Sequence, residues 1–398
     1  ARAEPQAERL RAVVGGDWLY ERTGQWLDGR YLLPMYARLA VARPELAAQA
    51  RHLVSAKDLL FHWLTEELLT DPSTAAGFGA YDVRSRRWLG EPLDGLAELL
   101  AAQAPRLPDV AASATTRPLC GAAARALGLP VGLPICLGAA DSVLGALGLA
   151  ATTPGAVAYV SGTSNVVLAR AEAWIPDAQH RYLLTPLAHD DRCFGLELDL
   201  LATGSAIRWL SQLLAGVHDE ARLVAQAAVL DPTAAPTFLP YLAPGEQGAL
   251  WNADLHGTVL GLHLGHDGAQ LVRGLLNGIV LESRRCTEIL EQAGAAGGPL
   301  HVAGWCAADA GVRRDLADCC RLVVHAAAEG SPDCSAVGAA RLLARSLGDP
   351  LIELGGDLEV RPDERRGRVW DALWERHERA REAVTVVYEA QEALCTES

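Results

Sequence analysis

Asp141 is the first residue whose type and position could do chemistry. It follows a predicted strand over residues 130–138 and precedes small apolar residues that are typical of a helix. A carboxylate placed there could accept a hydroxyl proton during phosphoryl transfer. It could equally favour the helix dipole and cap free N–H groups at the helix start. The residues alone leave both interpretations open, although Asp141 is the only acidic residue between positions 131 and 168.

A second candidate is the turn Ser161-Gly162-Thr163-Ser164, which joins predicted strands over 156–160 and 165–169. Hairpins usually turn on Asn-Gly or a similar pair, whereas this turn carries three hydroxyls and one glycine. Backbone N–H groups in such a turn can form a concave anion site, and hydroxyls add donors. An ordinary polar turn would have the same composition, so its surroundings must decide.

Two glycines form the third candidate. Gly204 and Gly304 each stand at the junction of a predicted element, where a backbone could approach a nucleotide closely. Loop glycines are common, so each alone is a weak signal. His263 and His266 form an H-x-x-H pair, but no cysteine or carboxylate completes a metal site at matching spacing.

Motifs of other enzyme classes are absent from the sequence. It contains no G-x-S-x-G of a serine hydrolase, no GxxxxGK[ST] of a P-loop enzyme and no GxGxxG after a predicted strand. The net charge of −14 argues against a nucleic-acid partner or an anionic membrane. The nine cysteines include no CxxC pair, and no apolar run is long enough to span a bilayer. We therefore expect a cytoplasmic protein.

The elements that must position these residues change in character near residue 130. Residues 1–120 are predicted to be mostly helical, with a helix beginning after Ser55, a short extended segment at 81–88 and a helix over 93–102. Beyond 130, strands alternate with helices, which predicts an α/β architecture. The expected strands are 130–138 (buried), 156–160, 165–169, 238–242 and 300–304; the expected helices are 142–149, 203–214, 270–291, 311–320, 338–347 and 370–393.

Taken in order, these motifs resemble the FGGY carbohydrate kinases, the family of xylulokinase, gluconokinase and glycerol kinase. The segment Gly-Ala-Ala-Asp at 138–141 is similar to the end of the strand that carries the family's catalytic Asp. The turn at 161–164 looks like the family's second phosphate loop, and Gly-Thr-Val-Leu-Gly-Leu at 257–262 is close to its second signature. The resemblance runs over essentially the whole chain, and the order and spacing of the pieces make it specific.

The resemblance implies an α/β, actin-like ATPase fold of two RNase H-like domains, with ATP and sugar meeting in the cleft between them. We expect a sugar-binding domain over 1–153 and a nucleotide-binding domain over 154–398, separated at the turn 153–155. The N-terminal domain is expected to be incomplete. The family begins with a strand and a first phosphate loop, and nothing like them is found here. Ala1-Arg2-Ala3 looks like the point just after the family's Asp-x-Arg-Ala motif, so about 100 residues would be missing.

Residue roles also follow from the resemblance. Asp141 would be the base that deprotonates the sugar hydroxyl, and Thr163 with its turn would hold the ATP phosphates. Gly204 and Arg208 would line the nucleotide pocket, and Gly304 would approach the adenine or ribose. Trp305 stands where the family has consecutive glycines, and it could stack on the base or block it.

The implied function is ATP-dependent phosphorylation of a sugar or polyol, with Mg²⁺ as the accompanying metal and the pentulose (xylulose) kinases as the nearest branch. An alternative is a nucleotide-binding or regulatory module that does not catalyse, since the first phosphate loop is not found and the adenine loop is altered. A different actin-like ATPase is disfavoured by the context of Asp141. The sequence leaves the oligomeric state open, a homodimer included.

Overall fold

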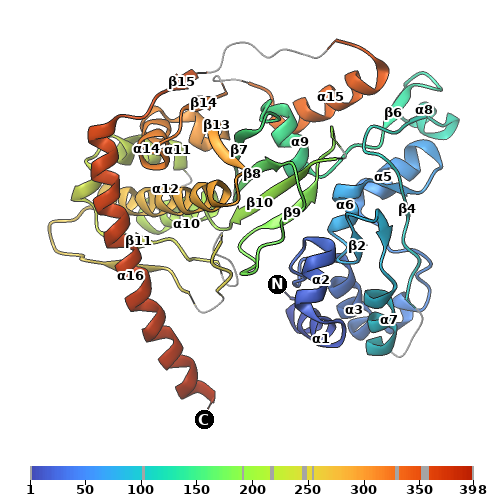
Figure 1. The fold of residues 1–398 in the computed structure, drawn as a ribbon, viewed down its shortest axis with the longest axis horizontal. Coiled ribbons are helices and arrows are strands. Elements are labelled where there is room, and N and C mark those ends of the chain that lie inside the picture. The colour runs from blue at the N-terminus through green and yellow to red at the C-terminus, as the bar shows by residue number, and fades with distance from the viewer. Residues whose placement is uncertain are drawn as a thin grey trace. The chain divides into compact units, whose positions relative to one another are not determined.

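The computed structural model describes residues 2–100, 104–190, 192–215, 219–243, 249–252, 255–327, 331–350 and 358–396. The chain forms two compact units, and each unit is made of three separate segments (Figure 1). Unit 1 comprises residues 1–148, 171–195 and 335–353, and unit 2 comprises 149–170, 196–334 and 354–398. The continuous functional domains expected over 1–153 and 154–398 stay a prediction.

Unit 1 consists of helices joined by short strands. Its helices are α1 (Glu4–Val14), α2 (Gly16–Thr23), α3 (Leu32–Ala42), α4 (Pro44–Ala47), α5 (Ala56–Thr65), α6 (Pro72–Ala76), α7 (Gly90–Leu100), α8 (Gly121–Leu127), α9 (Asp141–Gly148) and, from residue 335 on, α15 (Cys334–Leu347). Its strands are β1 (Leu69–Thr70), β2 (Tyr81–Asp82), β3 (Arg87–Trp88), β4 (Asp109–Val110), β5 (Thr116–Pro118), β6 (Pro134–Cys136) and β9 (Leu183–Pro186).

The first hundred residues pack as the helical periodicity predicts. Helices α1, α3 and α7 contact one another and bury Leu10, Leu33 and Leu96 in a common core. The helix start after Ser55 is confirmed, because α5 begins there with a capping box. The Asp58 N–H donates to Ser55 Oγ at 3.1 Å, and the Ser55 N–H donates to the Asp58 carboxylate at 3.2 Å. The extended segment forms the β2–β3 hairpin.

The strand before Asp141 differs from the prediction. A buried strand was expected over 130–138, but β6 is three residues long and pairs antiparallel with β5 alone. Pro134 is exposed, and Ile135 and Cys136 are half-buried. The reason lies in the prolines, because Pro134 stands opposite Pro118 and neither has an N–H to donate to a wider sheet.

Unit 2 is organised around a mixed sheet in which β15, β14, β13, β7, β8 and β10 are neighbours in that order. Strand β13 runs parallel to β7 and β14, whereas β7 and β8 form the expected antiparallel hairpin. Both faces of this hairpin are covered, since Val157 and Tyr159 on one face and Ala158 and Leu168 on the other expose at most 2% of their surface. The bounds are β7 (Gly155–Ser161), β8 (Asn165–Ala171), β10 (Phe194–Leu200), β13 (Ala296–Gly304), β14 (Val324–Ala326) and β15 (Leu358–Val360), with a separate ribbon of β11 (Thr237–Leu239) and β12 (Thr258–Leu260).

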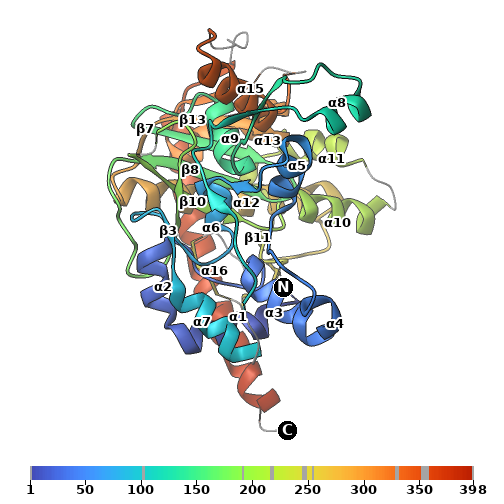
Figure 2. The same cartoon turned by 90° about the vertical axis from the view of Figure 1, so that its right-hand side faces the viewer.

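The helices of unit 2 surround the long helix α12, which packs against α11, α14 and β11. Helix α16 contacts α14 and β11, and its C-terminal half extends away from the sheet (Figures 1 and 2). Within the described ranges, no helix combines the length and apolar character needed to cross a bilayer. The helices are α10 (Gly204–Ala215), α11 (Glu220–Ala228), α12 (Gly268–Gln292), α13 (Trp305–Ala308), α14 (Ala310–Cys320) and α16 (Glu364–Thr396), with a 3₁₀ turn at Pro232–Ala234.

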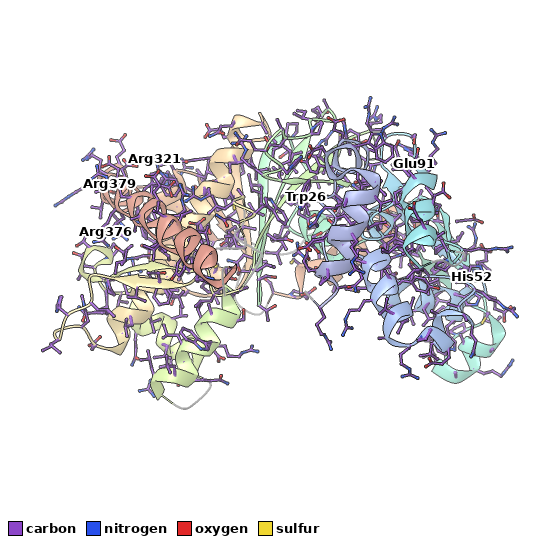
Figure 3. All side chains as sticks on the ribbon, turned by 90° about the horizontal axis from the view of Figure 1, so that it is seen from below. Trp26, His52, Glu91, Arg321, Arg376 and Arg379 are labelled. Atoms are coloured by element: carbon purple, nitrogen blue, oxygen red, sulfur yellow. The ribbon has the colours of Figure 1, made fainter. Side chains whose placement is uncertain are left out.

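An ionic cluster joins α16 to α12. The carboxylate of Glu282 is buried, accepts a hydrogen bond from Tyr241 Oη at 2.7 Å and lies 2.9 Å from Arg285 Nε and 2.7 Å from His377 Nε2. Burial alone would raise the pKa of Glu282, but Arg285 and His377 outweigh burial and hold the pKa below its ordinary value. Further arginines lie on or beside α16, where Figure 3 labels Arg321, Arg376 and Arg379.

Candidate functional site

The hydroxyl turn, residues 161–164, lies at the end of the β7–β8 hairpin. Its base is fixed by the pairing of Ser161 with Asn165 across the two strands. The Gly162 N–H donates to the Ser164 carbonyl at 2.8 Å. In the parts of the chain that the structure describes, the N–H groups of Thr163 and Ser164 have no acceptor. These two backbone donors are therefore left to meet a ligand, and the anion site expected from the sequence stays a prediction.

Two glycines press against this turn. A Cβ on Gly204, the first residue of α10, would overlap the Gly162 carbonyl oxygen. Gly304 has φ +81°, and a Cβ there would overlap the Ser161 carbonyl oxygen. The close approach of these two backbones to the turn thus requires glycine at positions 204 and 304. At position 304, the positive φ angle favours glycine as well. The start of α10 is docked on the turn, because Ser205 donates from both N–H and Oγ to the Thr163 carbonyl at 3.1 Å.

Ser161 holds the loop after β13. Its side chain is buried, its Oγ donates to the Ala303 carbonyl at 2.6 Å, and the same oxygen accepts the Cys306 N–H at 2.9 Å. These two contacts place Gly304 and Trp305 beside the hydroxyl turn. The Ser161 hydroxyl is therefore engaged within the protein. The backbone N–H groups and hydroxyls of Thr163 and Ser164 are the groups of the turn that are left to meet a ligand.

A cavity of about 650 Å³ opens beside the turn, entirely within unit 2. This volume is in the usual range for small-molecule sites, roughly 300–1,000 Å³. The structure brings six residues that the sequence singled out onto this one cavity: Ser161, Gly162, Thr163, Gly204, Arg208 and Trp305. Ser164 lies in the turn but is not among the lining residues, and Gly304 is exposed next to Trp305, which does line the cavity.

One wall of the cavity was missed by sequence reasoning. Helix α11 contributes Glu220, Ala221, Val224 and Ala225. These four residues belong to no sequence motif. Only their helical spacing could have suggested that they lie on one face of α11. Ile207, Trp305 and Ala308 add further apolar surface, and Asp309 completes the lining.

The charged groups of the cavity are already engaged. Arg208 Nε lies 3.2 Å from Glu220 Oε1, and the Arg208 side chain is 56% exposed, so it can turn toward a ligand. Asp309 caps α14 by accepting the N–H groups of Gly311 at 2.8 Å and Val312 at 3.0 Å. The cavity thus combines apolar walls, a rim of backbone donors and one accessible cation, which suits a ligand with a flat apolar part and an anionic part.

The described residues that line the cavity do not form a metal site. Its two carboxylates are committed to Arg208 and to the N-terminus of α14. Among the described residues, no group of three His, Cys, Asp or Glu side chains could hold a metal. The ring centroids of His263 and His266 lie 3.7 Å apart in an exposed loop, and the described part of the chain supplies no third ligand. Both carboxylates among the described lining residues are therefore already engaged within the protein.

Asp141 belongs to unit 1, where it is exposed and begins α9. Its Oδ1 accepts the N–H of Ser142 at 2.9 Å. At the other end of α9, Arg341 Nη1 donates to the carbonyls of Leu147 and Gly148, both at 2.9 Å. Helix α15, which carries Arg341, therefore caps the helix that presents Asp141.

A buried polar network precedes Asp141, and the sequence had not indicated it. The Ala140 N–H donates to Ser73 Oγ at 2.8 Å. Asp71 Oδ2 accepts the Ser73 N–H at 3.0 Å and Ser113 Oγ at 3.2 Å. These contacts fix the backbone at the residue before Asp141, which limits how far its carboxylate can move.

Lys57 completes this network. Its Nζ lies 3.1 Å from Asp58 Oδ1 and 3.1 Å from Asp71 Oδ1, and it donates to the Leu137 carbonyl at 3.3 Å. Both carboxylates are fully buried, whereas the Lys57 side chain is 26% exposed. One ammonium thus lies between two buried carboxylates and contacts the chain that leads to α9.

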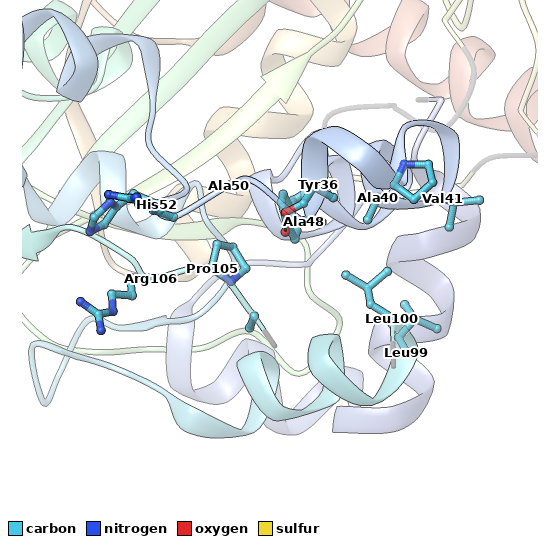
Figure 4. A pocket seen from close by; sticks show the side chains of 14 residues that line it. Tyr36, Ala40, Val41, Ala48, Ala50, His52, Leu99, Leu100, Pro105 and Arg106 are labelled. Atoms are coloured by element: carbon cyan, nitrogen blue, oxygen red, sulfur yellow. Dashed lines mark hydrogen bonds between the residues drawn. The ribbon is translucent and has the colours of Figure 1, made fainter. Parts of the chain in front are cut away.

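A second cavity, of about 840 Å³, lies among the helices of unit 1 (Figure 4). His52 and Arg106 stand at one end, and Val41, Leu99 and Leu100 at the other. None of the residues that the sequence singled out for chemistry lines it. We assign no role to this cavity.

Comparison with known proteins identifies the family. The model of the FGGY family of carbohydrate kinases, N-terminal domain, matches residues 1–148, and that of the C-terminal domain matches residues 157–347. The chain therefore belongs to the FGGY family of carbohydrate kinases, as its sequence motifs predicted.

Individual relatives agree with this assignment. The chain is 25% identical over 300 residues to a gluconokinase of Bacillus licheniformis, a match that covers 70% of this chain and 55% of that protein. It is 28% identical over 258 residues to a xylulose kinase of Escherichia coli, covering 65% and 52%. The chain thus spans about half the length of the curated relatives it matches.

Solved structures give the same fold. A xylulose kinase from Rhodospirillum rubrum aligns with TM-score 0.83 at 26% identity, covering 98% of this chain and 79% of that one. A xyloylose kinase from Brucella ovis aligns with TM-score 0.85 at 22% identity, covering 96% and 79%. The predicted actin-like ATPase, two-domain α/β fold is confirmed.

Proposed function

We propose that the protein transfers the γ-phosphoryl group of ATP to a hydroxyl of a sugar or polyol. The observation that carries the proposal is the cavity of unit 2, where the hydroxyl turn lies beside apolar walls. Among the described residues, the N–H groups of Thr163 and Ser164 in this turn have no acceptor. The phosphates would lie at this turn and at the N-terminus of α10, where N–H groups and the helix dipole favour negative charge. The base and ribose would lie against Ile207, Val224 and Trp305.

Asp141 is proposed as the general base. Its carboxylate is exposed at the start of α9 and can accept the proton of the attacking hydroxyl. The new bond forms between that hydroxyl oxygen and the γ-phosphorus, while the bond from phosphorus to the leaving oxygen of ADP breaks. Mg²⁺ would arrive with the nucleotide phosphates, and no step is assigned to it here.

For the acceptor we propose a pentulose of the xylulose type. Xylulose kinases among both the relatives and the solved structures support this choice. Gluconokinases match the chain to a similar degree, so a hexonate belongs in the test. A cytoplasmic location and a homodimer stay predictions.

One observation favours a second function, a nucleotide-binding or regulatory module without catalysis. The cavity is built from unit 2 alone, so nucleotide binding there needs no residue of unit 1. Such a module would bind ATP or ADP without transferring phosphate.

Two measurements on the chain separate these functions. Titration calorimetry with ATP and with ADP tests the cavity, and a coupled ADP-release assay over pentuloses, polyols and hexonates tests transfer. We expect Asp141→Asn to bind ADP like the wild type and to lose turnover by about 10²-fold or more. Glu91→Gln, which changes another exposed acid at a helix start in unit 1, should keep full turnover.

The results of the titration and of the ADP-release assay distinguish the two proposed functions. Binding heat without turnover for any acceptor would support the regulatory module. No heat with either nucleotide would contradict both functions, and full turnover in Asp141→Asn would remove Asp141 from the mechanism.

A further inference from the structure

A chain of buried side chains runs beneath the hydroxyl turn. Thr203 Oγ1 donates to Asn165 Oδ1 at 2.7 Å, and Asn165 Nδ2 donates to Tyr159 Oη at 2.6 Å. Tyr159 Oη lies 2.7 Å from Ser283 Oγ, which in turn donates to the Ile279 carbonyl at 2.8 Å. The four side chains expose between 0% and 3% of their surface.

The direction of these hydrogen bonds is determined by the number of hydrogens. Ser283 has one hydroxyl hydrogen, and it is used on Ile279, so Tyr159 must be the donor to Ser283. Tyr159 is then free to accept from Asn165, whose amide oxygen accepts from Thr203. Each group has its partner, which makes the network sensitive to the loss of any one member.

This network links the elements that surround the proposed phosphate position. Asn165 follows the hydroxyl turn directly, Thr203 precedes Gly204 at the start of α10, and Ser283 lies on α12. None of Thr203, Asn165, Tyr159 and Ser283 lines the cavity. They can therefore affect a ligand only through the backbone that they hold.

We propose that Tyr159 is a positioning residue for the anionic part of the nucleotide. Through Asn165 and Thr203 its hydroxyl holds the hydroxyl turn and the N-terminus of α10 in the arrangement that receives the phosphates. This inference rests on the proposed nucleotide site. Burial raises the pKa of Tyr159 well above its ordinary value, so the hydroxyl keeps its proton and stays a donor.

The test compares two variants that each lose one buried phenol oxygen. Tyr159→Phe breaks the network, whereas Tyr20→Phe removes a hydroxyl of unit 1 that donates to the Tyr182 carbonyl at 2.6 Å. Titration calorimetry with ATP, ADP and adenosine separates phosphate binding from nucleoside binding. We expect Tyr159→Phe to bind ATP and ADP about tenfold more weakly and adenosine within about twofold of wild type. Tyr20→Phe should bind all three like the wild type.

A second variant covers the case in which Tyr159→Phe does not fold. Thr203→Val keeps the side-chain shape, removes the donor to Asn165 and should show the same selective loss for ATP and ADP. Equal weakening of all three ligands, or no weakening, would overturn the positioning role while the nucleotide site stands. Failure of the wild type to bind any nucleotide would overturn the site itself, and the inference with it.

Discussion

Gly204, the first residue of α10, lies against the carbonyl oxygen of Gly162 so closely that no side chain fits between them. This contact sets the distance between a helix N-terminus and the hydroxyl turn, and both are proposed to bind the same phosphates.

Gly204→Ala should therefore push α10 away from the turn. We expect ADP to bind at least about tenfold more weakly, and overpacking should lower the free energy of unfolding by ~1–3 kcal/mol. Calorimetry and urea unfolding measure the two effects. Gly121→Ala is the control, since a Cβ there would meet only the end of the Arg125 side chain at 3.5 Å. Unchanged ADP affinity in Gly204→Ala would show that the contact does not shape the site.

Trp305 should act as a stacking surface for the base. Removing the ring in Trp305→Ala is expected to weaken ADP binding by about tenfold, the size typical of base–aromatic stacking. The buried Trp305 Nε1 has no hydrogen-bond partner among the described residues, so Trp305→Phe should keep most of the affinity. Calorimetry distinguishes the variants, and tighter binding by Trp305→Ala would instead show that the indole blocks the cavity.

Lys57 is the only lysine in the chain, in which arginine supplies every other permanently basic side chain. A compact ammonium can sit between the carboxylates of Asp58 and Asp71, whereas a planar guanidinium cannot occupy the same space. We expect Lys57→Met to lower the free energy of unfolding by ~3–5 kcal/mol, because it leaves two buried charges unpaired. Lys57→Arg should be destabilising as well.

Arg43→Lys serves as the control for Lys57, since its ion pair with Glu45 is exposed on both sides. It should change stability by less than ~0.5 kcal/mol. Urea unfolding followed by circular dichroism compares the three variants. A wild-type midpoint in Lys57→Met would mean that the network before Asp141 contributes nothing to the fold.

Glu282 should make the packing of α16 sensitive to acid. Its folded-state pKa lies below the ordinary value of 4.5, so its stabilising contribution is complete above that pH. The contribution is lost as pH falls through the lower, folded-state pKa. Glu282→Gln should cost ~3–5 kcal/mol at pH 7, because Arg285 and His377 lose their buried partner, and its stability should fall less on acidification than that of the wild type.

Urea unfolding at several pH values between 7 and 3 measures this dependence. Glu375→Gln on α16 is the control, since Glu375 is 72% exposed and its pair with Arg379 is 3.9 Å long. It should retain the wild-type stability and the wild-type pH dependence. Parallel acid curves for the wild type and Glu282→Gln would rule out a role for this carboxylate.

Features with a local cause could be predicted from the sequence. The capping box at Ser55, the β7–β8 hairpin and helix α12 each follow from neighbouring residues, and all three are present. The hydroxyl turn and Gly204 were singled out separately, and the structure brings both to one cavity. The prediction that the strand before Asp141 is buried was wrong. Apolar residues between prolines have the composition of a core strand, but the prolines prevent them from joining a larger sheet.

Features made by distant residues could not be predicted in this way. The contact of Lys57 with the Leu137 carbonyl spans 80 positions, and neither residue signals the other. The wall that α11 adds to the cavity has no motif. From the sequence, Tyr159 is indistinguishable from any other core residue of a strand. Only the three-dimensional structure shows that its hydroxyl forms hydrogen bonds with Asn165 and Ser283.

The discontinuous course of the chain affects how the protein can be made. Helix α9 receives its C-terminal cap from Arg341, which is translated 194 positions after Leu147. During translation, the helix that begins at Asp141 therefore lacks the Arg341 cap until most of unit 2 has been synthesised. Neither unit corresponds to one uninterrupted stretch of the gene, so a cut at any single codon would leave both halves with an unfinished unit.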